Sequence, residues 1–266
     1  MTESLTGPAA SLLELAERVA RQAGRELLDR YGSATGVGTK SSATDPVSDA
    51  DRAAEDMLVT ALVSERPDDG LLGEEGAERP ATSGLRWVLD PLDGTVNFLY
   101  RFPGWCVSVA CEDRSGDTWI ALVGVVHDPL RDETFSAVRG GGARLNGAAL
   151  AVNDPVPLER ALIATGFGYD AEHRRRQAAI VAELIPRVRD IRRAGSAALD
   201  LCAVAAGRVD GYYEDSPSRW DWAAGGLVAA EAGAEVGTLL APDGNPGVLA
   251  AGPALAGPLR AAVTRP

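Results

Sequence analysis

The sequence predicts an α+β fold of stacked helix and sheet layers. Two segments with helical spacing come first, and a run of short strand-like segments bounded by turn residues follows. The second half alternates strand-like and helix-like segments, and this order is typical of layered helix and sheet architectures. With 266 residues, 45% of them hydrophobic, the chain can bury a substantial core.

Two helices are expected at the N-terminal end. The first is predicted from Ser11, which has the spacing of a capping box with Glu14, to Gly32, and its apolar residues recur at helical intervals. The second is predicted from about Ser48 and cannot continue past Pro67, because proline breaks a helix interior.

A mostly antiparallel sheet is expected next, with a tight hairpin at Asn146-Gly147, where both residues tolerate positive φ. Its predicted strands are residues 87–90, 105–111, 119–126, 133–138 and 148–152. The remaining segments alternate: strands at 161–166, 209–213 and 248–251, helices at 171–184, 196–206 and 220–232, and a short helix after Pro253. A boundary near residues 153–157 divides the chain into an N-terminal α+β lobe, 1–153, and a C-terminal α/β lobe, 154–266, within one compact unit.

Charge and cysteine content restrict the function classes. The formal net charge of −12 disfavours nucleic-acid or anionic-membrane binding as a main role, because both need a positive surface field. A small anionic substrate would need metal ions to reverse the local sign. The three cysteines show no close-spaced pair, and we find no secretion signal or membrane-spanning run, so buried thiols in a cytoplasmic protein are expected.

The strongest chemical signal is an apolar strand that ends in Asp90 and Asp93. Pro91 fixes φ and Gly94 frees the backbone to turn, so the two carboxylates can converge on one point, where a hard divalent cation would relieve their repulsion. The N–H groups of Gly94 and Thr95 offer a place for a phosphate oxygen. Taken alone, the segment is equally typical of a solvated acidic turn.

Three more acidic clusters strengthen the metal interpretation. Glu74 and Glu75 end an apolar run between glycines, Asp51 lies at a helix start, and Asp221 stands between two tryptophans before a helix of small residues. Capping and macrodipole roles at helix starts are the alternative for Asp51 and Asp221. The helix start near Gly195 could also receive an anion or hydroxyl.

Other chemistries find little support in the sequence. Cys202 and Arg208 have the spacing of a cysteine-phosphatase loop, but the residues between them are helix-like. Only two histidines are present: His127 is expected in a turn and His173 on an exposed helix face. Oxygen ligands, and hence magnesium, are what the residues leave available.

Together these motifs resemble the inositol monophosphatase family of the lithium-sensitive, magnesium-dependent phosphatase superfamily. The resemblance extends from Lys40 to Gly233 and rests on three signatures in order: Glu74-Glu75, residues 90–95, and Trp220-Asp221 followed by Ala, Gly and residues 231–233. It implies a layered α-β-α-β-α sandwich, a homodimer, and two to three Mg²⁺ ions per site.

The resemblance also implies ligands. One ion would be held by Glu74, Asp90 and the Leu92 carbonyl, and a second by Asp90, Asp93 and Asp221, with a weaker third ion near Glu74 through waters.

Further roles follow from the same resemblance. Asp51 and Thr95 resemble the pair that orients the attacking water, Glu74 belongs to the catalytic set, and Lys40 lies where the family keeps a lysine on a mobile loop. Ser196 stands where some relatives have threonine, which bears on fine substrate geometry. The implied substrate-binding residues are Asp93, Gly94, Thr95, Gly195, Ser196, Ala197, Glu214 and Asp221.

The expected activity is hydrolysis of a small polyol phosphate by direct in-line attack of a metal-activated water. Inositol 1-phosphate is the first choice, and histidinol phosphate, fructose 1,6-bisphosphate and adenosine 3′,5′-bisphosphate are alternatives. A haloacid-dehalogenase-type phosphatase is a rival, but the two residues between Asp90 and Asp93 and the tryptophan-flanked Asp221 argue against it. A partner-binding regulatory protein is the alternative from a different class.

Overall fold

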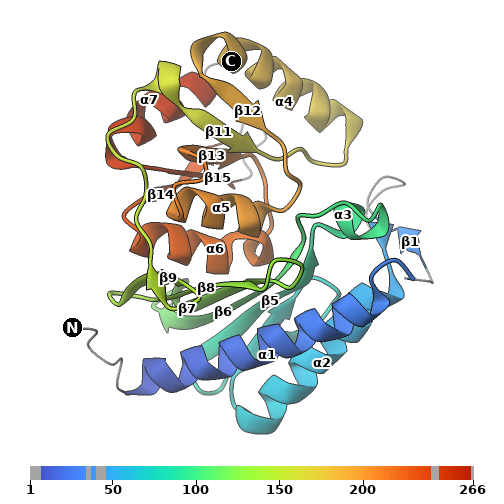
Figure 1. Ribbon diagram of the computed structural model, residues 1–266. Coiled ribbons are helices and arrows are strands. Elements are labelled where there is room, and N and C mark those ends of the chain that lie inside the picture. Colours follow the sequence, from blue (N-terminus) through green and yellow to red (C-terminus); the bar gives the residue numbers. More distant parts are fainter. Residues whose placement is uncertain (1–6, 34–36, 40–45, 241–245, 265–266) are drawn as a thin grey trace.

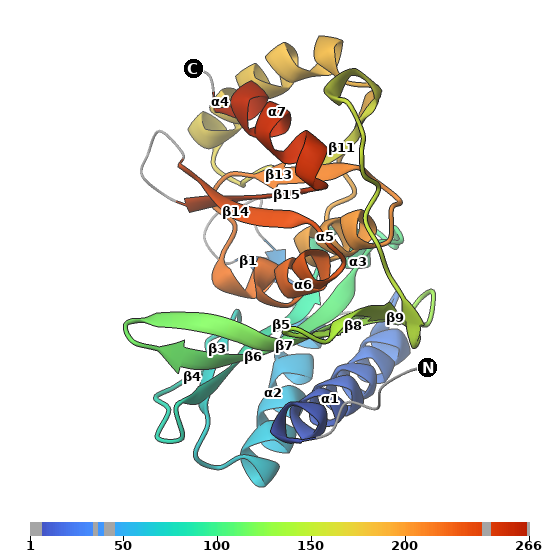
Figure 2. The ribbon, with the colours of Figure 1, turned by 90° about the vertical axis from the view of Figure 1, so that its left-hand side faces the viewer.

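The computed structural model describes residues 7–33, 37–39, 46–240 and 246–264. Five layers alternate: α1 and α2, an eight-stranded sheet, α5 and α6, a five-stranded sheet, and α4 with α7 (Figures 1 and 2). The predicted α-β-α-β-α sandwich is confirmed. Within the described ranges, no helix has the length and apolar character needed to cross a membrane.

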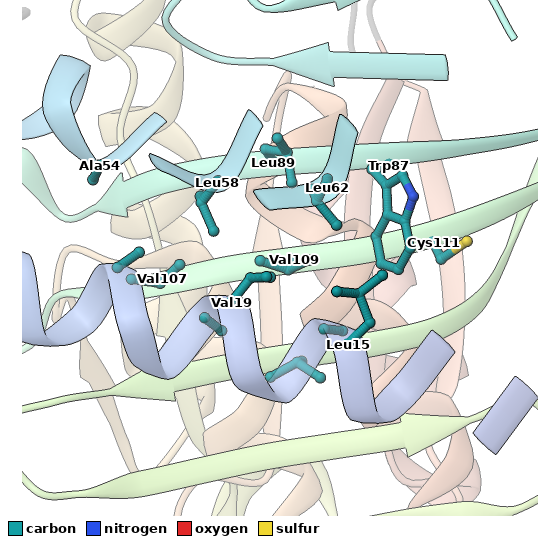
Figure 3. Packing of buried hydrophobic residues seen from close by; sticks show 14 of the residues in the cluster. Leu15, Val19, Ala54, Leu58, Leu62, Trp87, Leu89, Val107, Val109 and Cys111 are labelled. Atoms are coloured by element: carbon teal, nitrogen blue, oxygen red, sulfur yellow. The ribbon is translucent and has the colours of Figure 1, made fainter. Parts of the chain in front are cut away.

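The first layer consists of α1 (Pro8–Arg30) and α2 (Asp49–Glu65). The predicted capping box at Ser11 is wrong: the helix begins at Pro8, which suits a first turn, and the Ser11 hydroxyl donates back to the Pro8 carbonyl. The predicted start of the second helix is confirmed, with Ser48 as N-cap. Figure 3 shows apolar side chains of both helices packed on the first sheet. Those of the helices include Leu15, Val19, Leu58 and Leu62, and those of the sheet include Trp87, Leu89, Val107 and Val109.

The first sheet has the order β10-β9-β8-β7-β6-β5-β3-β4 and is antiparallel except where β3 runs parallel to β5. The expected hairpin is confirmed, because Asn146 and Gly147 have φ of 47° and 84° and join β9 to β10. The strands of this sheet are β3 (Gly70–Gly73), β4 (Glu78–Arg79), β5 (Leu85–Asp93), β6 (Cys106–Ser115), β7 (Thr118–Asp128), β8 (Glu133–Val138), β9 (Gly142–Leu145) and β10 (Ala148–Ala149). A separate pair, β1 (Gly38–Thr39) and β2 (Pro46–Val47), lies outside it.

The second sheet has the order β12-β11-β13-β15-β14, and its first three strands are parallel. Parallel strands bring their carboxyl ends to one edge, so the residues after them gather there. The strands are β11 (Leu162–Thr165), β12 (Asp190–Arg192), β13 (Gly211–Glu214), β14 (Glu235–Leu240) and β15 (Pro246–Ala251).

Two helices of small residues, α5 (Ala197–Ala205) and α6 (Arg219–Glu231), fill the layer between the sheets. Gly225 permits their close approach, because a Cβ there would lie 2.9 Å from the Ala198 carbonyl oxygen. The outer layer is α4 (Ala171–Leu184) and α7 (Pro253–Val263), and the short α3 (Thr95–Leu99) follows β5. The division into lobes 1–153 and 154–266 stays a prediction.

Candidate active site

A pocket of about 560 Å³ opens where the end of β5 meets the carboxyl edge of the second sheet and the first turns of α5 and α6. Most of the predicted site residues line it. Those in its wall are Glu74, Asp90, Leu92, Asp93, Gly94, Thr95, Gly195, Ser196, Ala197, Glu214 and Asp221.

The end of β5 turns its acids toward the pocket through a break in strand pairing. The register with β6 shifts between Asp90 and Asp93, and an Asp90 carboxylate oxygen accepts the Leu92 N–H at 3.0 Å. Gly94 follows with φ of 99°, and a Cβ there would lie 2.8 Å from the Gly104 carbonyl oxygen. Glycine is therefore required at this turn.

Asp51 reaches the site from the first turn of α2. Ser48 donates both its N–H and its hydroxyl to Asp51 Oδ2, at 2.8 and 2.6 Å. The other oxygen, Oδ1, lies 3.0 Å from the Thr95 hydroxyl, which is also 3.1 Å from the Leu92 carbonyl oxygen. The structure thus brings the predicted pair Asp51 and Thr95 into direct contact, and both are buried.

Asp93 links the two halves of the chain. Its Oδ2 accepts the Ser196 hydroxyl and the Ala198 N–H, both at 2.7 Å, so the start of α5 is fastened to the end of β5. Burial raises the pKa of Asp93 to about 6, although these two hydrogen bonds act to lower it.

Asp221 serves both as a helix-start residue and as a pocket residue. It lies in the first turn of α6, where it accepts the Ser218 N–H at 2.6 Å, and it also faces the pocket. Burial, followed by the charges of Asp93 and Glu74, raises the pKa of Asp221 well above its usual range.

The acids repel one another at the centre of the cluster. Burial, then the charges of Glu74, Asp93 and Asp221, raises the pKa of Asp90 well above its usual range. Carboxylate oxygens and a backbone carbonyl are the donors that a hard divalent cation prefers, so the donor set fits one. In the part of the chain that the structure describes, no three such side chains are already gathered as a group that could hold an ion.

Glu74 enters the pocket from the loop after β3, and a buried acid supports that loop. Glu55 accepts the N–H groups of Glu75 and Ala77, both at 2.9 Å, and a Cβ on Gly73 would lie 2.3 Å from its Oε2. Glycine at 73 lets the carboxylate of α2 approach the backbone this closely. Glu55 was not foreseen, but it lies four residues after Asp51 on one helix face, which is a signal that the sequence contains.

The opposite wall of the pocket carries Glu214 at the end of β13. Its Oε2 accepts the Tyr212 hydroxyl at 2.9 Å, and burial raises the pKa of Glu214 to about 7. A Cβ on Gly166 would lie 1.8 Å from Oε2, so the carboxylate rests against a glycine backbone.

Comparison with known proteins agrees with this geometry: the model of the inositol monophosphatase family matches residues 9–265. The chain belongs to the inositol monophosphatase family. It is 45% identical over 250 residues to the Mycobacterium tuberculosis protein named inositol-1-monophosphatase SuhB, covering 90% of this chain and 85% of the relative. It is 40% identical over 225 residues to the Escherichia coli protein named Nus factor SuhB, covering 84% and 83%.

Solved structures of this inositol monophosphatase family share the fold. The suhB protein of Bartonella henselae matches with a TM-score of 0.87 at 35% identity, covering 96% of this chain and 99% of that one. The Thermotoga maritima IMPase matches with a TM-score of 0.85 at 30% identity, covering 95% and 96%.

Two histidine predictions for this inositol monophosphatase family member are wrong. His173 is not on an exposed face: it lines the pocket, its Nε2 lies 2.7 Å from Asp215 Oδ2, and its ring packs on Gly168 at the start of α4. His127 is not in a turn, because β7 continues to Asp128 and the ring is buried with Nδ1 2.9 Å from the Thr134 hydroxyl.

The structure also bears on the cysteines and on the other acidic residues. All three cysteines are free and buried, as expected. Glu75 does not line the pocket, and Lys40 falls outside the described residues. Asp200 and Asp215 are pocket acids that sequence reasoning missed.

Proposed function

We propose that the chain is a magnesium-dependent phosphoric monoester hydrolase acting on a small polyol phosphate, with inositol 1-phosphate as the first substrate. The observation that carries the proposal is the acid cluster: Glu74, Asp90, Asp93 and Asp221 reach one pocket from three segments, and burial together with the charges of the neighbouring acids raises the pKa of Asp90 and of Asp221. Such a cluster binds cations and, once neutralised, can accept an anionic ester.

Bound magnesium would supply the positive charge that activates water and stabilises the transferring phosphoryl group. The groups that would hold it are Glu74, Asp90, the Leu92 carbonyl, Asp93 and Asp221. Two to three ions per site belong to the proposal.

Asp51 and Thr95 would handle the proton of the attacking water. The Thr95 hydroxyl can donate to Asp51 Oδ1, which leaves an oxygen lone pair to accept a hydrogen bond from water in the pocket. Asp51 is held at its other oxygen by Ser48, so the pair is oriented before substrate arrives. Asp51 would thus receive the proton through Thr95.

The substrate would lie across the pocket. The N–H groups of Gly94 and Thr95 lie at the start of α3 and favour a phosphate oxygen, and Gly195, Ser196 and Ala197 form the adjoining wall. Glu214 would accept a hydroxyl hydrogen bond from the alcohol part. Lys40, which lies outside the described residues, remains a proposed site residue.

An assay of phosphate release in the presence of magnesium tests the activity. Its substrates are inositol 1-phosphate, histidinol phosphate, fructose 1,6-bisphosphate and adenosine 3′,5′-bisphosphate. We expect release with the highest kcat/KM for inositol 1-phosphate and none with chelator. Absence of release from every ester would overturn the proposal.

A single turnover in isotopically labelled water tests the direct attack. We expect the label in phosphate and no acid-stable phosphoprotein, whereas phosphate found on Asp90 or Asp93 would favour the dehalogenase-type route. The proposal includes a cytoplasmic homodimer, which light scattering and fractionation would check.

A partner-binding role is the second candidate, because relatives from Salmonella and Escherichia coli at 40% identity are named Nus factor SuhB. The net charge of −12 disfavours direct nucleic-acid contact, so a protein partner is the form this candidate takes. Capture of one stoichiometric partner from cell extract by a protein that releases no phosphate would favour it.

A further inference from the structure

We propose that Asp200 is a specificity-determining residue that, together with Glu214, binds hydroxyl groups of the polyol part of the substrate. This inference rests on the proposed function. Asp200 belongs to none of the three acidic signatures in the sequence, and no role was predicted for it.

Asp200 has an unusual environment for a buried carboxylate. It lies in the first turn of α5, lines the pocket, and is only 5% exposed. Among the residues that the structure describes, we find no hydrogen bond or ion pair to its side chain, although its N–H donates normally to the Ser196 carbonyl at 3.0 Å. Buried carboxylates are costly without a partner, so a molecule in the pocket is the natural source of one.

The helix that carries Asp200 is fixed relative to the acid cluster. Ser196 caps α5, and the Ala198 N–H and the Ser196 hydroxyl both bind Asp93 Oδ2. Asp200 is therefore held at a set distance from the point where the phosphate would bind. A substrate anchored at its phosphate would present its alcohol part to this residue.

Glu214 faces the same region. Its charge, after burial, raises the pKa of Asp200 well above the usual range, while the Arg193 guanidinium acts in the opposite direction. Glu214 itself is fixed by the Tyr212 hydroxyl and by contact with Gly166. Two carboxyl groups and one guanidinium thus surround the alcohol end of the pocket.

This combination fits hydroxyl groups better than an ammonium group. Arg193 already places a positive charge near both acids, where it opposes the rise that burial causes in the pKa of each, so a second cation would meet its repulsion. A hydroxyl can donate to a carboxylate and accept from a guanidinium or a protonated carboxyl at the same time. Neighbouring hydroxyl groups of a polyol can satisfy Asp200 and Glu214 together.

The test compares Asp200→Ala and Asp200→Asn on inositol 1-phosphate, 4-nitrophenyl phosphate and phosphoethanolamine, with magnesium. We expect Asp200→Ala to lower the ratio of kcat/KM for inositol 1-phosphate to that for 4-nitrophenyl phosphate by about 10- to 100-fold, mainly through KM. Asp200→Asn keeps an acceptor oxygen and should restore most of the ratio. Asp117→Asn, which removes one charge from the exposed turn between β6 and β7, is the matched control and should change nothing.

Each contrary result is distinct. Equal losses on all three esters would overturn the inference in favour of a structural role for Asp200, and a loss confined to phosphoethanolamine would overturn it in favour of ammonium recognition. Melting temperatures of both variants show whether they fold. If the parent releases no phosphate from any ester, the proposed function fails. The inference about Asp200 is then tested by calorimetric measurement of affinity for inositol 1-phosphate. Equal affinity of the parent and Asp200→Ala overturns the inference.

Discussion

Ser196 supports the fold and the site at once, so Ser196→Ala should damage both. Its hydroxyl donates to Asp93 Oδ2 at 2.7 Å and accepts the Leu199 N–H at 3.2 Å as the N-cap of α5. Alanine removes both hydrogen bonds, and the Ala198 N–H remains on Asp93.

The expected loss follows from these contacts. An N-cap contributes about 1 kcal/mol to the free energy of unfolding, and a hydrogen bond to a carboxylate adds roughly 1.5 kcal/mol. Because 1 kcal/mol shifts the melting temperature of a chain of this size by about 2 to 4 °C, Ser196→Ala should lower it by roughly 5 to 10 °C. The lost bond favoured ionised Asp93, so its pKa should rise above about 6 and the acidic limb of the activity profile should move to higher pH.

Circular dichroism melts at pH 7 and phosphate-release rates between pH 5 and 9 measure the two effects. Ser196→Thr retains the hydroxyl and is the matched control, expected to melt within a few degrees of the parent. The reasoning is refuted if Ser196→Ala melts with the parent, or if Ser196→Thr is as unstable as Ser196→Ala.

Four further outcomes are expected. Asp90→Asn should lower kcat by roughly 10³-fold on every ester in a phosphate-release assay, since it removes charge from the centre of the cluster. Glu214→Gln should mainly lower kcat/KM for polyol esters, and equal loss on all esters would contradict this. Activity should vanish in chelator, return with magnesium and be inhibited by lithium; full turnover in chelator would contradict it. The metal-free melting temperature should fall between pH 4.5 and about 7, because folded Glu214 keeps its proton up to about pH 7 and the unfolded form does not; Glu214→Gln should reduce that fall.

Local signals made much of the fold predictable. The helix starting after Ser48 and the Asn146-Gly147 hairpin each depend on residues close in sequence, whereas the five-layer order came from the family resemblance. Two strands of the second sheet were missed, β12, which has charged residues at both ends, and β14, although Gly233, with φ of 100°, marks a turn before it. Both are edge strands, where burial on one side leaves little hydrophobic pattern.

The acid cluster was predictable because each acid sits in a short motif at the end of a strand or the start of a helix. Asp200 and Asp215 were not, because their place in the pocket depends on how α5 and the second sheet pack. His173 shows the same limit: its helix position suggested exposure, but the absence of a side chain at Gly168 lets the ring approach within the pocket wall. Such contacts join residues that no local pattern connects.

In this structure the same residues start helices and belong to the site. Asp51, Ser196 and Asp221 each complete the first turn of a helix. Ser196 and Asp221 line the pocket and Asp51 contacts Thr95 in its wall, so the hydrogen bonds that start α2, α5 and α6 also set the positions of the site residues. Substituting them should lower stability and activity together. Asp90 differs, because its hydrogen bond is local to the Leu92 N–H while its charge opposes three neighbouring acids. Relief of that repulsion should give metal-free Asp90→Asn a higher melting temperature than the metal-free parent. This is expected where residues needed for activity destabilise the folded protein.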